Sequence, residues 1–122
     1  MSVEPKNLEE ATLCLIEYHI RAYRKVKDFL VEYSPQERKE MKPVLVKEGW
    51  PPSVNACKIH IKKAKNLISA ITENGLNKEG VNDYLIEQCA GKEPSVAVVR
   101  EGWKKIFSMS LEQSLPIVTK TA

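Results

Sequence analysis

The chain has no run of apolar residues approaching the roughly 20 that a membrane-spanning helix needs. It also lacks the motifs by which many enzyme sites are recognised: a nucleophile elbow, a phosphate-binding glycine loop, or a pair of histidines spaced on a helix to bind a metal. These absences predict a protein without a membrane span, a catalytic residue, a metal site or a cofactor. We therefore expect that it is not an enzyme.

Cysteine is scarce, and the three residues Cys14, Cys57 and Cys89 are widely spaced. An odd number of distant cysteines favours small buried thiols over a disulfide framework. Residues 1–10 carry acidic side chains where a secretory signal peptide would have a basic start and an apolar block. We expect a cytoplasmic protein, intracellular and not secreted, without disulfides.

The composition is that of one soluble globular domain covering residues 1–122, with 43% hydrophobic and 29% charged residues. Apolar residues recur at three- and four-residue steps, and no alternating segment is strong enough to predict a strand. The predicted helices are 8–33, a short one from 35 to about 47, 54–74, a short one from 77 to about 90, and 96–111. The sequence thus predicts an all-α fold, a single compact bundle of about five helices, three long and two short.

Capping signals place several helix ends. Ser34 begins a predicted capping box, and Ser53 and Ser95 precede apolar helical patterns. Asn77 is expected to cap the fourth helix. Pro43 would remove a backbone hydrogen bond inside the second helix, so we expect that helix to end or kink just before it.

Two short strings recur in the chain. The segment 46–50 (VKEGW) returns as 99–103 (VREGW), and 19–21 (HIR) is echoed by 60–62 (HIK). An internal duplication of roughly 8–50 and 54–103 would explain both echoes, but their offsets differ, whereas a true repeat has a fixed period. Duplication and coincidence both remain open, and in either case Trp50 and Trp103 are expected to be structural anchors.

The excess positive charge is concentrated in one helix. Residues 50–74 hold four lysines and one acidic residue, and Lys58, Lys62 and Lys65 line one stripe of the helix. Such a row could contact nucleic-acid phosphates, joined by Arg21 and Arg24 if the two helices correspond. A solvated helix face is the simpler interpretation, because the isoelectric point near 8.7 lies below the value above ~9 that is typical of nucleic-acid binders.

Two other kinds of site are disfavoured. Residues 74–85 have the turn glycine and apolar spacing of a helix-turn-helix, but the second helix would present Glu79, Asp83 and Glu87 to DNA. A zinc site from two Cys-His pairs, one of them Cys14 and His19, fails because a five-residue step turns a helix by about 140°.

These observations favour a helical interaction module that binds a protein partner or assembles with itself, with nucleic-acid binding as the alternative. Its contact surface is expected to use apolar residues that one helix cannot bury on its own. The candidates are Ile16, Ile20, Tyr23, Ile59, Met109 and Leu115. The alternative is that a wide core buries most of them.

Overall fold

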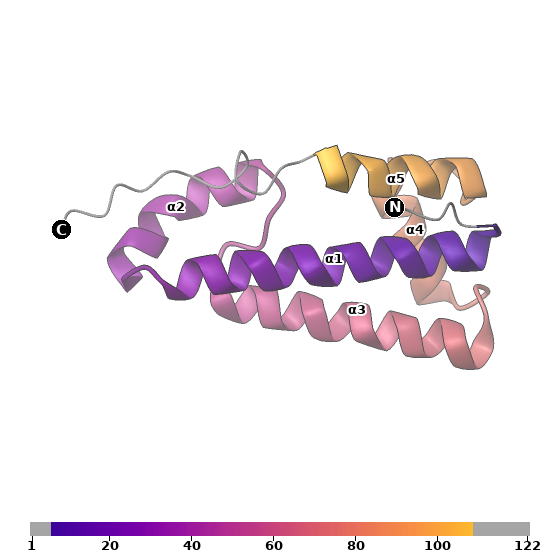
Figure 1. Cartoon of the computed structure of the whole chain (residues 1–122), viewed down its shortest axis with the longest axis horizontal. Helices are drawn as coiled ribbons and strands as arrows, with labels where there is room; N and C mark the ends of the chain where they lie inside the picture. The colour runs from indigo at the N-terminus through magenta and orange to yellow at the C-terminus, as the bar shows by residue number, and fades with distance from the viewer. Residues whose placement is uncertain (1–5, 109–122) are drawn as a thin grey trace.

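The protein is built around its first helix. The computed structural model describes residues 6–108, and no strand occurs in that range. The helices are α1 (Leu8–Val31), α2 (Pro35–Lys47), α3 (Val54–Asn74), α4 (Glu79–Gln88) and α5 (Val96–Ser108). Helices α3 and α5 lie on opposite sides of α1, and α2 and α4 lie toward its opposite ends (Figure 1). The predicted all-α bundle of five helices is confirmed.

Short-range hydrogen bonds define where most of these helices begin. The Glu10 N–H donates to Asn7 Oδ1 at 2.8 Å and starts α1. The capping box at α2 is present, because the Glu37 N–H donates to Ser34 Oγ at 3.2 Å and the Ser34 N–H donates to the Glu37 carboxylate at 2.9 Å. Ser53 and Ser95 accept equivalent bonds at 3.1 and 3.2 Å. These three predicted serine caps are therefore confirmed.

The prediction for Asn77 is wrong. Helix α4 begins at Glu79, and its N-cap is Lys78, whose side chain makes no capping hydrogen bond. The side chain of Asn77 is exposed instead. The fourth helix is consequently shorter than expected and starts without the side-chain acceptor that usually satisfies the first backbone N–H groups.

Pro43 does not end the second helix, since α2 continues through it to Lys47. Met41 and Leu45 lie one turn apart on either side of the proline, and both are fully buried. Burying an apolar side chain of this size contributes about 1.5–3 kcal/mol. Two such residues outweigh the hydrogen bond that Pro43 cannot make, and α2 stays helical across it.

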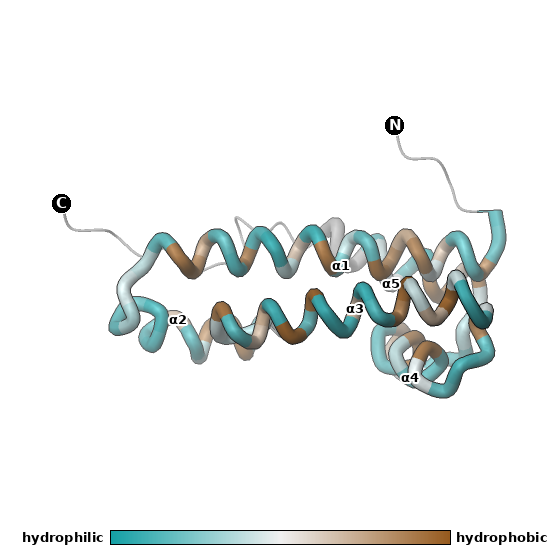
Figure 2. Tube along the Cα trace, turned by 90° about the horizontal axis from the view of Figure 1, so that it is seen from below, coloured by the Kyte–Doolittle hydropathy of each residue, from teal (hydrophilic) through white to brown (hydrophobic). Residues whose placement is uncertain are grey.

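The core consists of two clusters that share α1. Apolar residues recur at helical spacing along α1 and α3 (Figure 2). The first cluster contains Ala11, Leu15, Ile16, Ile20, Ile61, Ala64, Leu67, Ile71, Val81, Leu85, Cys89, Val99 and Trp103. The second cluster contains Ala22, Val26, Leu30, Met41, Leu45, Trp50 and Cys57. The beginning of α1 thus packs with α3, α4 and α5, and its end packs with α2 and the start of α3.

The two echoing strings adopt different local structures. Gly49 follows the end of α2 with φ +84°, a conformation that glycine adopts readily. Gly102 lies inside α5, where the Cβ of any larger residue would lie 3.7 Å from Cys89 Sγ. Trp50 belongs to the second cluster and Trp103 to the first. Both tryptophans are buried, but Trp50 follows the end of a helix, whereas Trp103 lies within one.

Among the described residues, the helices do not combine the length and apolar character required to cross a bilayer.

Candidate functional site

The solvent side of α3 is a basic surface with an apolar residue in its middle. Lys58, Lys62, Lys63 and Lys65 are exposed, and so is Ile59, at 59% of its full area. Lys62 and Lys63 lie three and four positions after Ile59, so they flank it on the next turn. We call these five residues the α3 basic face. Lys58, Lys62 and Lys65 form no ion pair in the part of the chain that the structure describes.

The structure does not bring Arg21 to this face. Its guanidinium carbon lies 5.8 Å from the centre of the Tyr18 ring. Tyr18 in turn stacks on Trp103 of α5, with ring centres 5.4 Å apart and an angle of 10° between the planes. Arg21 is therefore on the α5 side of α1, whereas α3 lies on the other side (Figure 1). Arg24 is exposed on α1.

Two of the apolar contact candidates need correction. Ile16 and Ile20 are buried in the first cluster, so neither is left on the surface. The reason is that α1 lies between α3 and α5, and this double coverage widens its buried face beyond what one amphipathic stripe predicts. Tyr23 is half-buried, and Ile59 is exposed as expected. The two remaining candidates, Met109 and Leu115, lie outside the described residues.

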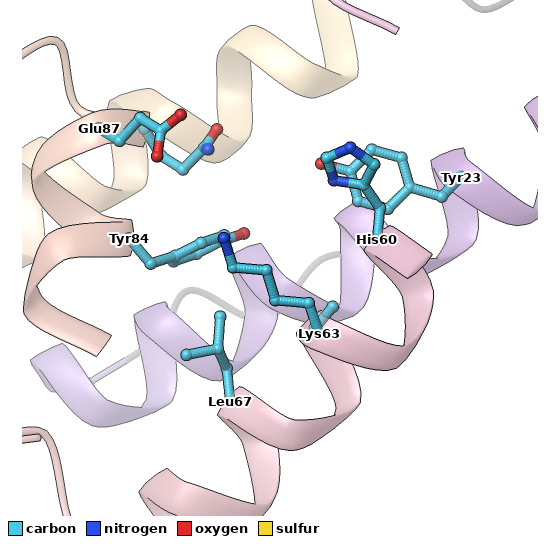
Figure 3. Close-up of a pocket in the computed structure, with 8 residues that line it drawn as sticks. Tyr23, His60, Lys63, Leu67, Tyr84 and Glu87 are labelled. Carbon is cyan, nitrogen blue, oxygen red and sulfur yellow. The ribbon is translucent and has the colours of Figure 1, made fainter. Parts of the chain in front are cut away.

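A small hollow opens where α1, α3 and α4 meet, with a volume of about 60 Å³. Tyr23 of α1, His60 and Lys63 of α3, and Tyr84 and Glu87 of α4 line it (Figure 3). The hollow is far smaller than the ~300 Å³ at which small-molecule sites usually begin. It has room for a few water molecules or one side chain, and it marks where the α3 basic face meets α4.

Three aromatic side chains that line the hollow, Tyr23, His60 and Tyr84, form a cluster with His19 of α1. His19 Nδ1 shares a hydrogen bond with the Tyr84 hydroxyl, and the two rings meet edge to face at 5.7 Å. Tyr23 stacks on His19 at 5.5 Å and packs against His60 at 5.2 Å. These contacts connect α1 to both α3 and α4. Together with the buried side chains of Val81, Leu85 and Cys89, they hold α4 in the bundle.

Burial shifts the pKa values of His19, Tyr23 and Tyr84 in the direction that favours their uncharged forms. Burial, and secondly the nearby His60, lower the pKa of His19 to about 4. Burial, assisted by Glu87 and Cys57, raises the pKa of Tyr23 to about 12. Burial also raises the pKa of Tyr84, with smaller contributions from Tyr23, Cys89 and Glu87. At neutral pH the imidazole of His19 and both phenols are therefore uncharged.

The three cysteines are held as thiols. Burial raises the pKa of Cys57 to about 11, despite the opposing effect of Lys27. The pKa values of Cys14 and Cys89 are raised by burial and by neighbouring glutamates. A raised pKa disfavours the thiolate, which is the nucleophilic form. Residues 6–108 also contain no group of three or more side chains positioned to bind a metal.

Sequence reasoning missed the outward side of α4. Glu79, Asp83 and Glu87 follow one another at four-residue steps and are exposed, and Ile86 is exposed at 40% of its full area. We call these four residues the α4 acidic face. The four-residue spacing of these carboxylates is visible in the sequence and argues against DNA binding, but by itself it does not indicate a contact surface. The α4 acidic face resembles the α3 basic face with the opposite charge only because Ile86 is exposed, and that exposure is visible in the structure but not in the sequence.

Comparison of the chain with protein-family models, with curated proteins and with solved structures gives no match.

Proposed function

We propose that the protein is a helical interaction module, without catalytic chemistry of its own, that binds an acidic protein surface through the α3 basic face. The observation that carries this proposal is the exposure of Ile59 among four lysines on α3. An apolar residue surrounded by charges of one sign suits a partner with a hydrophobic centre and an acidic rim. Protein interfaces commonly combine an apolar centre with a polar rim in this way.

The alternative is a nucleic-acid binder that contacts backbone phosphates through Lys58, Lys62 and Lys65. The specific support for it is that these three lysines are exposed, lie at helical spacing and form no ion pair within the described residues. Phosphate contacts need little else. Ile59 favours a protein, because an isoleucine gains nothing from a phosphate backbone, and Arg21 does not add to the row because it lies on the α5 side.

The ionisable groups of the described chain support a binding role over catalysis. Where their pKa values are shifted, the thiols of Cys57 and Cys89 and the phenol of Tyr84 are moved away from their nucleophilic forms. Activated nucleophiles usually show shifts in the opposite direction. His19 could accept a proton, but it is buried and bonded to Tyr84, so it has no access to a substrate.

The test compares two labelled probes over a salt series. One is a helical peptide with leucines along its centre and glutamates along both flanks, and the other is a short duplex DNA or single-stranded RNA of similar charge. We expect the peptide to bind more tightly. Replacing Lys58, Lys62 and Lys65 by Gln should weaken peptide binding roughly tenfold, since each exposed ion pair contributes at most about 1 kcal/mol.

Ile59→Ser distinguishes the two candidate functions. It should weaken peptide binding roughly fivefold, because part of an isoleucine's burial, on the order of 1 kcal/mol, is lost. Nucleic-acid binding should not respond to this change. The matched control replaces Lys39, Lys42 and Lys47 by Gln; these lysines are exposed on α2 and should leave peptide binding unchanged. Tighter nucleic-acid binding that ignores Ile59→Ser would favour the alternative, and no binding of either probe at low salt would refute both.

A further inference from the structure

Helices α3 and α4 present complementary outward faces. The α3 basic face has exposed lysines around Ile59, and the α4 acidic face has exposed carboxylates around Ile86. No lysine or arginine occurs between Glu79 and Gly91, so nothing on α4 offsets its negative charge. The α3 basic face suits a partner that has an apolar centre and negative charge. The α4 acidic face has both of these properties.

The two faces adjoin within one chain but do not neutralise each other. They meet at the hollow, where Lys63 and Glu87 both belong to the lining (Figure 3). Lys58, Lys62 and Lys65 lie further along or around α3 and form no ion pair in the part of the chain described. Both isoleucines also remain exposed. The two faces therefore do not pair with each other within one molecule, and both are accessible to a second molecule.

We propose that the partner is a second copy of this chain, with the α3 basic face of one copy packed on the α4 acidic face of the other and Ile59 set against Ile86. This rests on the proposed function, because it assumes that the α3 basic face is a contact surface, and it identifies the partner. Since both faces adjoin on one molecule, a two-fold axis brings each α3 against the opposite α4. The same contact is then made twice, which is the commonest symmetry of soluble oligomers.

The physical character of this contact determines how it must behave. Its charges are exposed at the rim, so the attraction between copies is screened by salt and weakens as ionic strength rises. The apolar contribution of the two isoleucines is not screened in this way. Association is therefore strongest at low ionic strength and falls with added salt without being abolished by moderate concentrations.

A charge exchange between the two faces tests the proposal by sedimentation velocity at low salt. The α3 variant carries Lys58→Glu and Lys62→Glu, and the α4 variant carries Glu79→Lys and Asp83→Lys. Each variant alone juxtaposes like charges, and its association constant should fall at least roughly tenfold. An equal mixture of the two variants restores opposite charges at both contacts of each mixed pair, because one variant then presents two acidic faces and the other two basic ones. The mixture should therefore associate more tightly than either variant alone.

Control variants show whether a loss of association belongs to this contact. Lys39→Glu with Lys42→Glu changes α2 by the same charge and should leave association intact. Far-ultraviolet circular dichroism checks that each variant is folded, and the milder pair Glu79→Gln and Asp83→Asn covers the case in which the short helix α4 does not tolerate lysines. The mild pair should weaken association severalfold and make it less sensitive to salt.

Two results would overturn the inference in different ways. A wild-type protein that stays monomeric at low salt, yet binds the acidic peptide in an Ile59-dependent manner, would refute self-association and leave the proposed function standing. Association that persists in both charge variants, or that the mixture does not strengthen, would place any contact between copies elsewhere on the surface.

Discussion

His19 and His60 occupy similar sequence contexts and opposite environments. Each is followed by an isoleucine and a basic residue, but His19 is only 5% exposed, whereas His60 is exposed on α3 at the rim of the hollow. The buried imidazole shares its hydrogen bond with Tyr84, a residue 65 positions away. This contact over a long sequence distance helps to hold α4 against α1, beside the buried Val81 and Leu85, and it uses an uncharged histidine.

Stability is expected to fall as the pH drops from 6.5 toward 4. The pKa of His19 is lowered to about 4 in the folded protein from an ordinary value of 6.5, so between these values the unfolded chain binds more protons. Acid therefore favours unfolding, by up to about 3 kcal/mol over this window. Urea denaturation at a series of pH values measures the effect, and His19→Gln should remove most of it.

His60→Gln is the matched control for this measurement. Burial is the larger cause of the shift in the pKa of His19, and His60 is the smaller one. The His60 variant should therefore keep most of the dependence of stability on pH. A wild-type protein with equal stability at both ends of the window, or a His19→Gln variant with the wild-type dependence, would contradict this role of His19.

Helix α2 remains helical despite an internal proline. Because Met41 and Leu45 are buried on either side of Pro43, packing sustains a helix that is one backbone hydrogen bond short. Pro43→Ala should raise the free energy of unfolding by about 2 kcal/mol, which is the helical penalty of proline less its favourable restriction of the unfolded chain. Urea denaturation measures this change.

Lys42→Ala provides the comparison on the same helix. Lys42 is exposed and precedes the proline, so its replacement should change stability by less than about 0.5 kcal/mol. Equal or lower stability of Pro43→Ala relative to the wild type would mean that the rigidity of the proline contributes more to α2 than the missing hydrogen bond costs.

Across the whole protein, short-range signals in the sequence predict short-range features of the structure, such as the residues at which helices begin. Ser34, Ser53 and Ser95 begin helices as expected because a cap depends on residues three positions apart. The burial of Ile16 was mispredicted because periodicity gives the direction of a buried face, whereas its width depends on how many helices cover it. The α4 acidic face was missed because exposure of Ile86 is likewise a property of the assembled bundle.

The division of the core into two clusters, each with one tryptophan, supplies two optical probes of folding. With Trp50→Phe, fluorescence reports on Trp103 in the first cluster, and with Trp103→Phe it reports on Trp50 in the second. The second cluster has fewer buried residues, so its emission should change at lower urea concentration than that of the first. Coincident transitions would instead show that α1, which passes through both clusters, makes them melt as one cooperative unit.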